Sequence, residues 1–159
     1  MISHPGLKIG LDYSLKTWNK EKTKKGISKV LTKSYHLKPS IGFYYHRRYQ
    51  TGAFLSTEFS RQRQNIKGGF FSYGVNLGFL CTVVPNTYRV LPQGVVEKAI
   101  AAHYYVWPGW SLAFGKDLSV KHGTPLSWFV KPQFMYALPN FPSGVGYFIL
   151  ETGIVYKLK

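Results

Sequence analysis

The sequence is poor in cysteine, in acidic residues and in long apolar runs. Cys81 stands alone, so an internal disulfide is excluded, and its apolar surroundings predict a small buried or lipid-facing side chain. No run reaches the ~18 apolar residues of a transmembrane helix, which excludes that class of membrane protein. Only 6 Asp and Glu oppose 21 Lys and Arg, and the net charge of +15 favours polyanionic partners.

The motifs of cofactor and metal chemistry are also missing. There is no P-loop, no dinucleotide fingerprint and no zinc-ligand spacing, so we predict no cofactor, no metal and no enzymatic activity. His36 and His46 are ten residues apart on one predicted strand, too far along it to share a metal ion. His103 with Ser111 is the pair that a lipid-modifying hydrolase would use, and this alternative stays open although no compact motif surrounds the pair.

What the sequence does contain is strict alternation, most clearly over residues 144–159. Phe148, Ile154 and Tyr156 belong to a large apolar set on every second position, whereas Glu151 and Lys157 lie on the opposite face. In a soluble sandwich the apolar face would meet a core. In an outer-membrane barrel it faces lipid, and the polar face points into the lumen.

The same pattern recurs along the chain and predicts about eight strands in a single domain, residues 1–159. Aromatic residues are 17% of the chain and recur on the same parity in every strand, as a lipid-facing belt requires. The expected strands cover residues 7–18, 35–46, 53–60, 71–81, 100–106, 110–114, 126–136 and 146–158.

Two stretches leave the strand count open. Pro108 and Gly109 fit a type II turn, which we favour; if Pro108 is a kink inside one long strand, the count falls to seven. Residues 83–98 form either a hairpin about Pro92 that projects beyond the barrel or a plain long loop.

Collecting the residues on the polar faces predicts the contents of the interior. An eight-stranded barrel is just wide enough to be filled by side chains, so we expect a plug of ion pairs in which Asp12, Glu58 and Glu151 each contact a Lys or Arg. The predicted network comprises Lys8, Asp12, Lys38, Glu58, Lys131 and Glu151, and the same faces also carry Lys16, His36, His46, Asp117 and Lys157.

Residues 20–33 are predicted to be a solvated hairpin connection. This segment holds six lysines and a single glutamate, so it is expected to contact anionic lipid, lipopolysaccharide or a partner protein. The residues concerned are Lys20, Lys22, Lys24, Lys25, Lys29 and Lys33.

Over nearly its whole length the chain resembles the small outer-membrane β-barrel proteins of Gram-negative bacteria. The resemblance is carried by the strand faces, by the glycine–aromatic alternation of residues 69–80 and by the terminal Gly153-Ile154-Val155-Tyr156-Lys157-Leu158, the last of which looks most like barrels of the Bacteroidetes group. It departs from them at its final residue, Lys159, which is not aromatic.

The resemblance implies an all-β, antiparallel, up-and-down transmembrane barrel in the outer membrane, with a filled lumen and no open pore. Such a protein contacts outer-membrane lipids, including lipopolysaccharide, and we expect a structural or accessory role beside a larger outer-membrane complex. Residues 1–6 carry no secretory signal, so for an exported protein we expect that the signal has been removed. The main alternative is a soluble basic barrel that binds nucleic acid or another polyanion; the charge favours it, and the charged groups on its core face oppose it.

Overall fold

The computed structural model describes residues 5–24, 27–45, 50–90, 92, 94, 96–138 and 144–157, which form nine strands and one short helix. No helix in these segments is long and apolar enough to cross a membrane. The elements are β1 (Gly6–Gly10), β2 (Tyr13–Lys24), β3 (Ile27–Tyr44), β4 (Thr51–Asn65), β5 (Gly69–Val90), β6 (Val96–Val106), β7 (Gly109–Asp117), α1 (Ser119–His122), β8 (Leu126–Ala137) and β9 (Val145–Tyr156).

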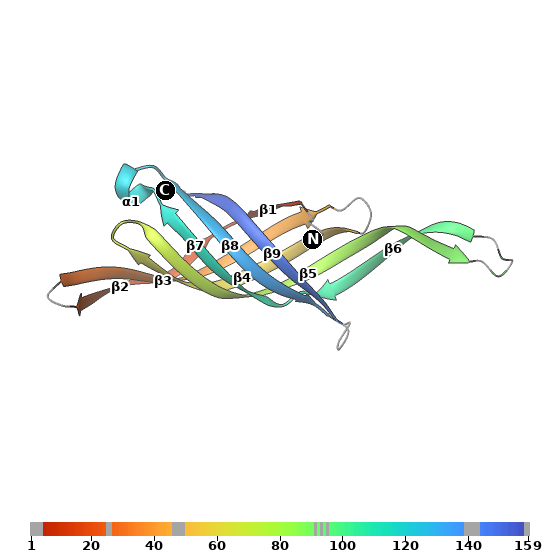
Figure 1. Ribbon diagram of the computed structural model, residues 1–159, viewed down its shortest axis with the longest axis horizontal. Helices are drawn as coiled ribbons and strands as arrows, with labels where there is room; N and C mark the ends of the chain where they lie inside the picture. The colour runs from red at the N-terminus through yellow and green to blue at the C-terminus, as the bar shows by residue number, and fades with distance from the viewer. Residues whose placement is uncertain are drawn as a thin grey trace.

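All nine strands belong to one antiparallel sheet in the order β1-β3-β4-β5-β7-β8-β9, with β2 also beside β3 and β6 also beside β5. Because β1 and β2 share one edge of β3, and β6 and β7 share one edge of β5, the nine strands form seven rows. The sheet curls into a half-barrel (Figure 1). The predicted all-β antiparallel architecture is confirmed; in the described part of the chain, no backbone ladder joins the first row to β9.

A proline explains why the first row is split. Leu11, between β1 and β2, donates its N–H to the carbonyl of Pro39 on β3 at 3.0 Å. The N–H and C=O of one strand residue point the same way, so the donor that Pro39 lacks would also have pointed at this first row. The first row therefore loses its ladder opposite Pro39, while β3 still pairs with β4 there, Pro39 opposite Thr57.

A second proline lies inside the fifth row, where the predicted turn at Pro108 is wrong. β6 pairs with β5 down to Val106 opposite Phe79, and β7 resumes with Gly109 opposite Asn76. Trp107 donates to the carbonyl of Gly78 at 2.7 Å, and Pro108 accepts from Tyr136 at 2.8 Å. The chain thus stays between β5 and β8 through the proline, which is a kink, and the row count is seven instead of eight.

The two long connections are strands and not loops over most of their length. Residues 20–33, predicted to be a solvated connection, continue the β2–β3 ladder as far as Lys24 opposite Ile27. Residues 83–98 form the projecting hairpin of the two alternatives, with Val90 opposite Val96. The two hairpins extend from opposite ends of the curled sheet (Figure 1). Threonine and valine, which favour extended backbone, recur in both hairpins and account for the longer ladders.

A bulge in β2 changes which side chains face outward. Tyr13 lies opposite Leu37, but Lys16 lies opposite Tyr35, so Leu15 is one residue too many on its strand. The insertion moves every later residue of β2 to the other face. Lys16, predicted to point into the interior, therefore shares the outer face with Trp18.

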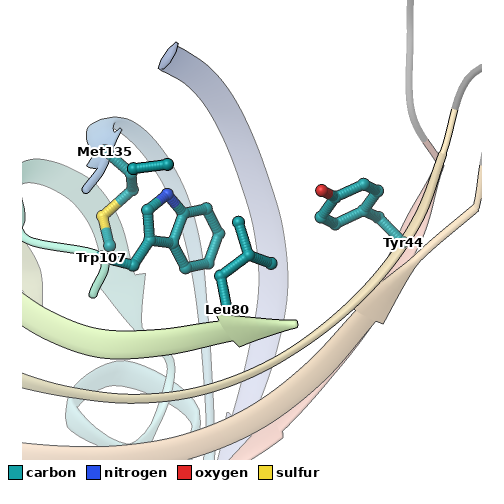
Figure 2. Packing of buried hydrophobic residues seen from close by; sticks show 5 residues of the cluster. Tyr44, Leu80, Trp107 and Met135 are labelled. Atoms are coloured by element: carbon teal, nitrogen blue, oxygen red, sulfur yellow. The ribbon is translucent and has the colours of Figure 1, made fainter. Parts of the chain in front are cut away.

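One end of the concave side holds an apolar cluster centred on Trp107, which is 2% exposed. The indole ring meets Phe54 and Tyr147 edge-on, at centroid distances of 5.0 and 5.8 Å. Trp107 turns inward at the break between β6 and β7, so the kink at Pro108 also places this anchor. Figure 2 shows Leu80 and Met135 beside the indole; the buried set is Tyr44, Leu80, Trp107, Met135 and Ala137.

Candidate functional site

The distribution of side chains between the two faces of the sheet is inverted relative to a soluble protein. The concave face buries mostly polar groups: Ser34, Ser40, Ser56, Glu58, Ser60, Ser72, Asn76, Thr82, Ser111, Asp117, Ser127, Lys131 and Gln133. Large apolar groups project from the outer face of every row; those more than 60% exposed include Leu7, Ile9, Ile41, Val75, Phe79, Phe148, Leu150 and Ile154. Tyr104, on β6, is 75% exposed.

Ion pairs cross the concave face between strands that are far apart in the sheet. Lys131 on β8 contacts Glu58 on β4 at 3.1 Å and Glu151 on β9 at 3.0 Å. Glu151 in turn accepts from Lys8 on β1 at 3.0 Å. The first row and the last row of the sheet are therefore joined through side chains, although no backbone ladder joins them within the described residues.

The chain of charges continues on the other side of Glu58. Lys38 on β3 lies 4.0 Å from Glu58 and 3.6 Å from Asp12, and His36 contacts Asp12 at 2.6 Å. All six residues predicted for the interior network, Lys8, Asp12, Lys38, Glu58, Lys131 and Glu151, thus form one connected series. Each of the three predicted carboxylates has a lysine partner.

The charges in this series balance, since three lysines face three carboxylates. Glu58 and Lys131 are the most buried members, with side chains 3% and 7% exposed, and Lys8 and Lys38 are about 20% exposed. Gln133 adds a 2.6 Å hydrogen bond to Glu151. Small neighbours such as Ser56 and Ser60 leave room for the long side chains. The arrangement fills the concave side and links distant strands. Beside Asp12, the hydroxyl of Ser34 lies 2.7 Å from Nε2 of His36, and Nδ1 of His36 lies 2.6 Å from Asp12, so a serine, a histidine and an aspartate are hydrogen-bonded in sequence.

A second polar cluster lies where β7 leads into α1. Asp117, which is buried, accepts hydrogen bonds from Gln64 at 3.1 Å and from the hydroxyl of Ser119 at 2.6 Å, and it forms an ion pair with Lys157. Asp117 and Lys157 were both predicted on the inner faces, and the structure brings them together. His46, from the same predicted set, lies outside the described residues.

The six predicted surface lysines are spread over the β2–β3 hairpin. Lys20, Lys22 and Lys24 belong to β2, Lys29 and Lys33 belong to β3, and Lys25 lies outside the described residues. In the backbone register Lys22 is opposite Lys29, near the end of the hairpin. The side chain of Lys20 is exposed.

The pair proposed for a hydrolase is not brought together. His103 lies opposite Thr82 on β5, whereas Ser111 lies opposite Gly74, eight residues away along the same strand. At about 3.3 Å per residue this separation is roughly 26 Å, which excludes proton transfer between them. The described residues also contain no cluster of three or more His, Cys, Asp or Glu that would hold a metal ion.

Sequence reasoning missed a cluster on the outer face centred on Arg61 of β4. The guanidinium lies 5.9 Å from the ring centroid of Trp18 and 5.7 Å from that of Tyr35, and it donates to the Tyr73 hydroxyl at 3.4 Å. The alternation along β4 and β5 places Arg61 and Tyr73 on the outer face. The alternation along residues 7–18 places Trp18 on the inner face, because it does not take account of the bulge at Leu15. A groove of about 490 Å³ opens beside Arg61.

Comparison of the chain with protein-family models, with curated proteins and with solved structures finds no match. A functional proposal therefore depends on the geometry described above.

Proposed function

We propose that this chain is an integral outer-membrane β-barrel protein with a structural or accessory role beside a larger outer-membrane complex. The observation that carries the proposal is the inversion of the sheet, with serines and ion pairs on the concave face and large apolar side chains on the convex face. In water such a surface would be a large contiguous apolar patch, which monomeric soluble proteins rarely expose. In a bilayer the same surface meets lipid, and the buried charges compensate one another.

The sheet edges support association with a partner. Six successive antiparallel pairings separate β1 from β9, so the first and last rows run parallel to each other. Open sheet edges in hydrocarbon leave backbone groups without hydrogen bonds, and an antiparallel closure between these two rows requires one more strand. A strand from a partner protein would form backbone hydrogen bonds with both edges. The Lys8–Glu151 ion pair would then lie on the concave side of that strand.

The filled interior favours a structural role over transport. Side chains from β1, β3, β4, β8 and β9 meet in one series of ion pairs across the concave face. A barrel of this width is occupied by its own side chains. The protein would therefore act through its outer surface, its edges and its two projecting hairpins.

The first test is fractionation followed by gel electrophoresis of boiled and unboiled samples. We expect the protein in the membrane fraction, extractable only with detergent, with a heat-dependent change in mobility, because a membrane barrel closed by its own strands or by a partner's strand stays folded in detergent until heated. Soluble protein without a mobility shift would overturn the membrane position. The net charge would then make a polyanion-binding assay the next measurement, as the soluble alternative requires.

A second prediction concerns the β2–β3 hairpin. Deleting residues 22–29 leaves Lys20 opposite Leu31 at the new end of the ladder, with Glu21 and Val30 as a two-residue turn, so the heat-dependent mobility shift should persist. Co-purification of the partner complex in mild detergent should fall, because the deleted segment carries four of the six predicted contact lysines.

The matched control keeps the ladder and removes only charge, by changing all four lysines of the segment, Lys22, Lys24, Lys25 and Lys29, to glutamine. Loss of co-purification in both variants would assign recognition to charge, and loss in the deletion alone would assign it to the strand. Unchanged co-purification in both would refute a role for this hairpin.

A further inference from the structure

We propose that the Arg61 cluster on the outer face binds the phosphate headgroup of an anionic membrane lipid. This inference rests on the membrane position proposed above and assigns a ligand to one site on that surface. The site comprises Arg61 with the aromatic rings of Trp18, Tyr35 and Tyr73, contributed by β2, β3, β4 and β5.

The guanidinium of Arg61 is held in place by aromatic groups and not by a carboxylate. It lies within 6 Å of two ring centroids, and the Tyr73 hydroxyl accepts from Nη1. No ion pair among the described residues includes Arg61, although seven others occur. A cation positioned by ring faces keeps its positive charge and presents N–H donors along its edge, which suits a phosphate oxygen.

Neighbouring positions on the outer face are also basic. Lys16 on β2 and Arg61 on β4 both lie directly opposite Tyr35 on β3, one on each side of it. Two residues farther along, where side chains again face outward, Lys33 on β3 lies opposite Arg63 on β4. Four cations from three adjacent strands therefore surround the rings.

Acidic residues do not offset this patch. Of the six in the sequence, Asp12, Glu58, Asp117 and Glu151 take part in the interior ion pairs. Glu21 is an odd number of residues from outward-facing Lys16 and Trp18 on β2 and so lies on the opposite face. Glu97 lies opposite Arg89 on the far hairpin. Because no ion pair of the described residues joins a carboxylate to Arg61, the patch is a local positive field.

The groove beside Arg61 selects a lipid over a free anion. Its volume is about 490 Å³, and Arg61 and Tyr35 line it together with Phe59, Val75, Trp110 and Leu112. Phe59, Val75 and Trp110 lie opposite one another on β4, β5 and β7. They are two residues from Arg61, toward the middle of the sheet. A phosphate at Arg61 would therefore place an acyl chain along the apolar part of the groove. A nucleic acid offers no such tail.

The test uses the purified, detergent-folded protein and native mass spectrometry with dioleoyl phosphatidylglycerol or dioleoyl phosphatidylcholine. We expect preferential retention of phosphatidylglycerol, and the Arg61→Gln variant should bind it about tenfold more weakly, the usual effect of losing one charge-assisted contact. Lys121→Gln removes the same charge at an exposed position of α1 that does not line the groove, and this variant should bind as the wild type does. Excess inorganic phosphate should displace little lipid, since it lacks the acyl chain.

Equal affinity of Arg61→Gln and wild type, with both showing the heat-dependent mobility shift, would overturn the lipid site while leaving the membrane barrel intact. Displacement by inorganic phosphate alone would show an anion site without lipid selectivity, which also overturns the proposal. If Arg61→Gln does not fold, Lys16→Gln combined with Arg63→Gln supplies the test, with a loss of several-fold expected. Soluble wild-type protein would instead contradict the proposed function itself.

Discussion

Changing Lys131 to methionine is expected to lower the free energy of unfolding by about 3–5 kcal/mol, the cost of leaving a buried charge without its partner. Lys131 contacts Glu58 at 3.1 Å and Glu151 at 3.0 Å, and the Glu58 side chain is only 3% exposed. Without Lys131, Glu58 keeps only Lys38, which is 4.0 Å away. Urea unfolding of the protein in lipid vesicles, followed by gel mobility, measures the change.

Lys8 provides the matched control for this prediction. Its side chain is 19% exposed, and its partner Glu151 retains Lys131 when Lys8 is changed to methionine. The loss should therefore be clearly smaller. Combining Lys131→Met with Glu58→Leu removes both buried charges and should recover most of the stability, because a buried ion pair is often replaced by apolar groups at little cost. Equal losses of stability for Lys131→Met and Lys8→Met would contradict the expectation that the more buried lysine contributes more to stability.

The inner and outer faces were predictable because a strand has a period of two. Glu58, Lys131 and Glu151 fall on the polar parity of their segments, and any antiparallel sheet that curls toward that parity brings them to one side. That each of these carboxylates would have a lysine partner was also predictable, because the sequence holds only 6 Asp and Glu against 21 Lys and Arg. Which lysine meets which carboxylate depends on stagger between distant strands, and the sequence does not specify it.

The errors came from places where the backbone departs from regular pairing. Pro108 has the local signature of a turn, yet flanking hydrogen bonds from Trp107 and Tyr136 hold the chain straight enough to stay in its row. The bulge at Leu15 shifts the parity of Lys16 and Trp18, so parity counted from residue 7 fails after it. Both features arise from contacts with neighbouring strands, which no local pattern contains.

The Arg61 cluster was hidden for the same reason. Arg61 and Tyr73 have outward parity in their own strands, but a binding site needs Trp18 on that face too, and only the bulge provides it. The lysines of the β2–β3 hairpin gave a more visible signal in the sequence. The geometry instead concentrates aromatic and cationic groups a few residues before that hairpin, at the border of the apolar surface.

Changing Leu77 to lysine should separate a lipid-facing surface from a water-facing one. Leu77 is 60% exposed and lies on β5 between outward-facing Val75 and Phe79. If this surface meets the bilayer interior, the lysine should destabilise the folded protein by about 2–4 kcal/mol. If it meets water, a substitution at such an exposed position should change the stability by no more than about 0.5 kcal/mol. Unfolding in lipid vesicles against urea measures the difference.

Ile66 supplies the control, because its side chain is 64% exposed in the turn between β4 and β5. Lysine near the membrane border costs only about 0–1 kcal/mol, so Ile66→Lys should be close to neutral under either interpretation. A large loss at Leu77 with little change at Ile66 would show that the cost depends on depth, which water cannot produce because its polarity is uniform. Near-neutral results at both positions would mean that the apolar belt does not face hydrocarbon, and the inverted sheet would then need another partner to cover it.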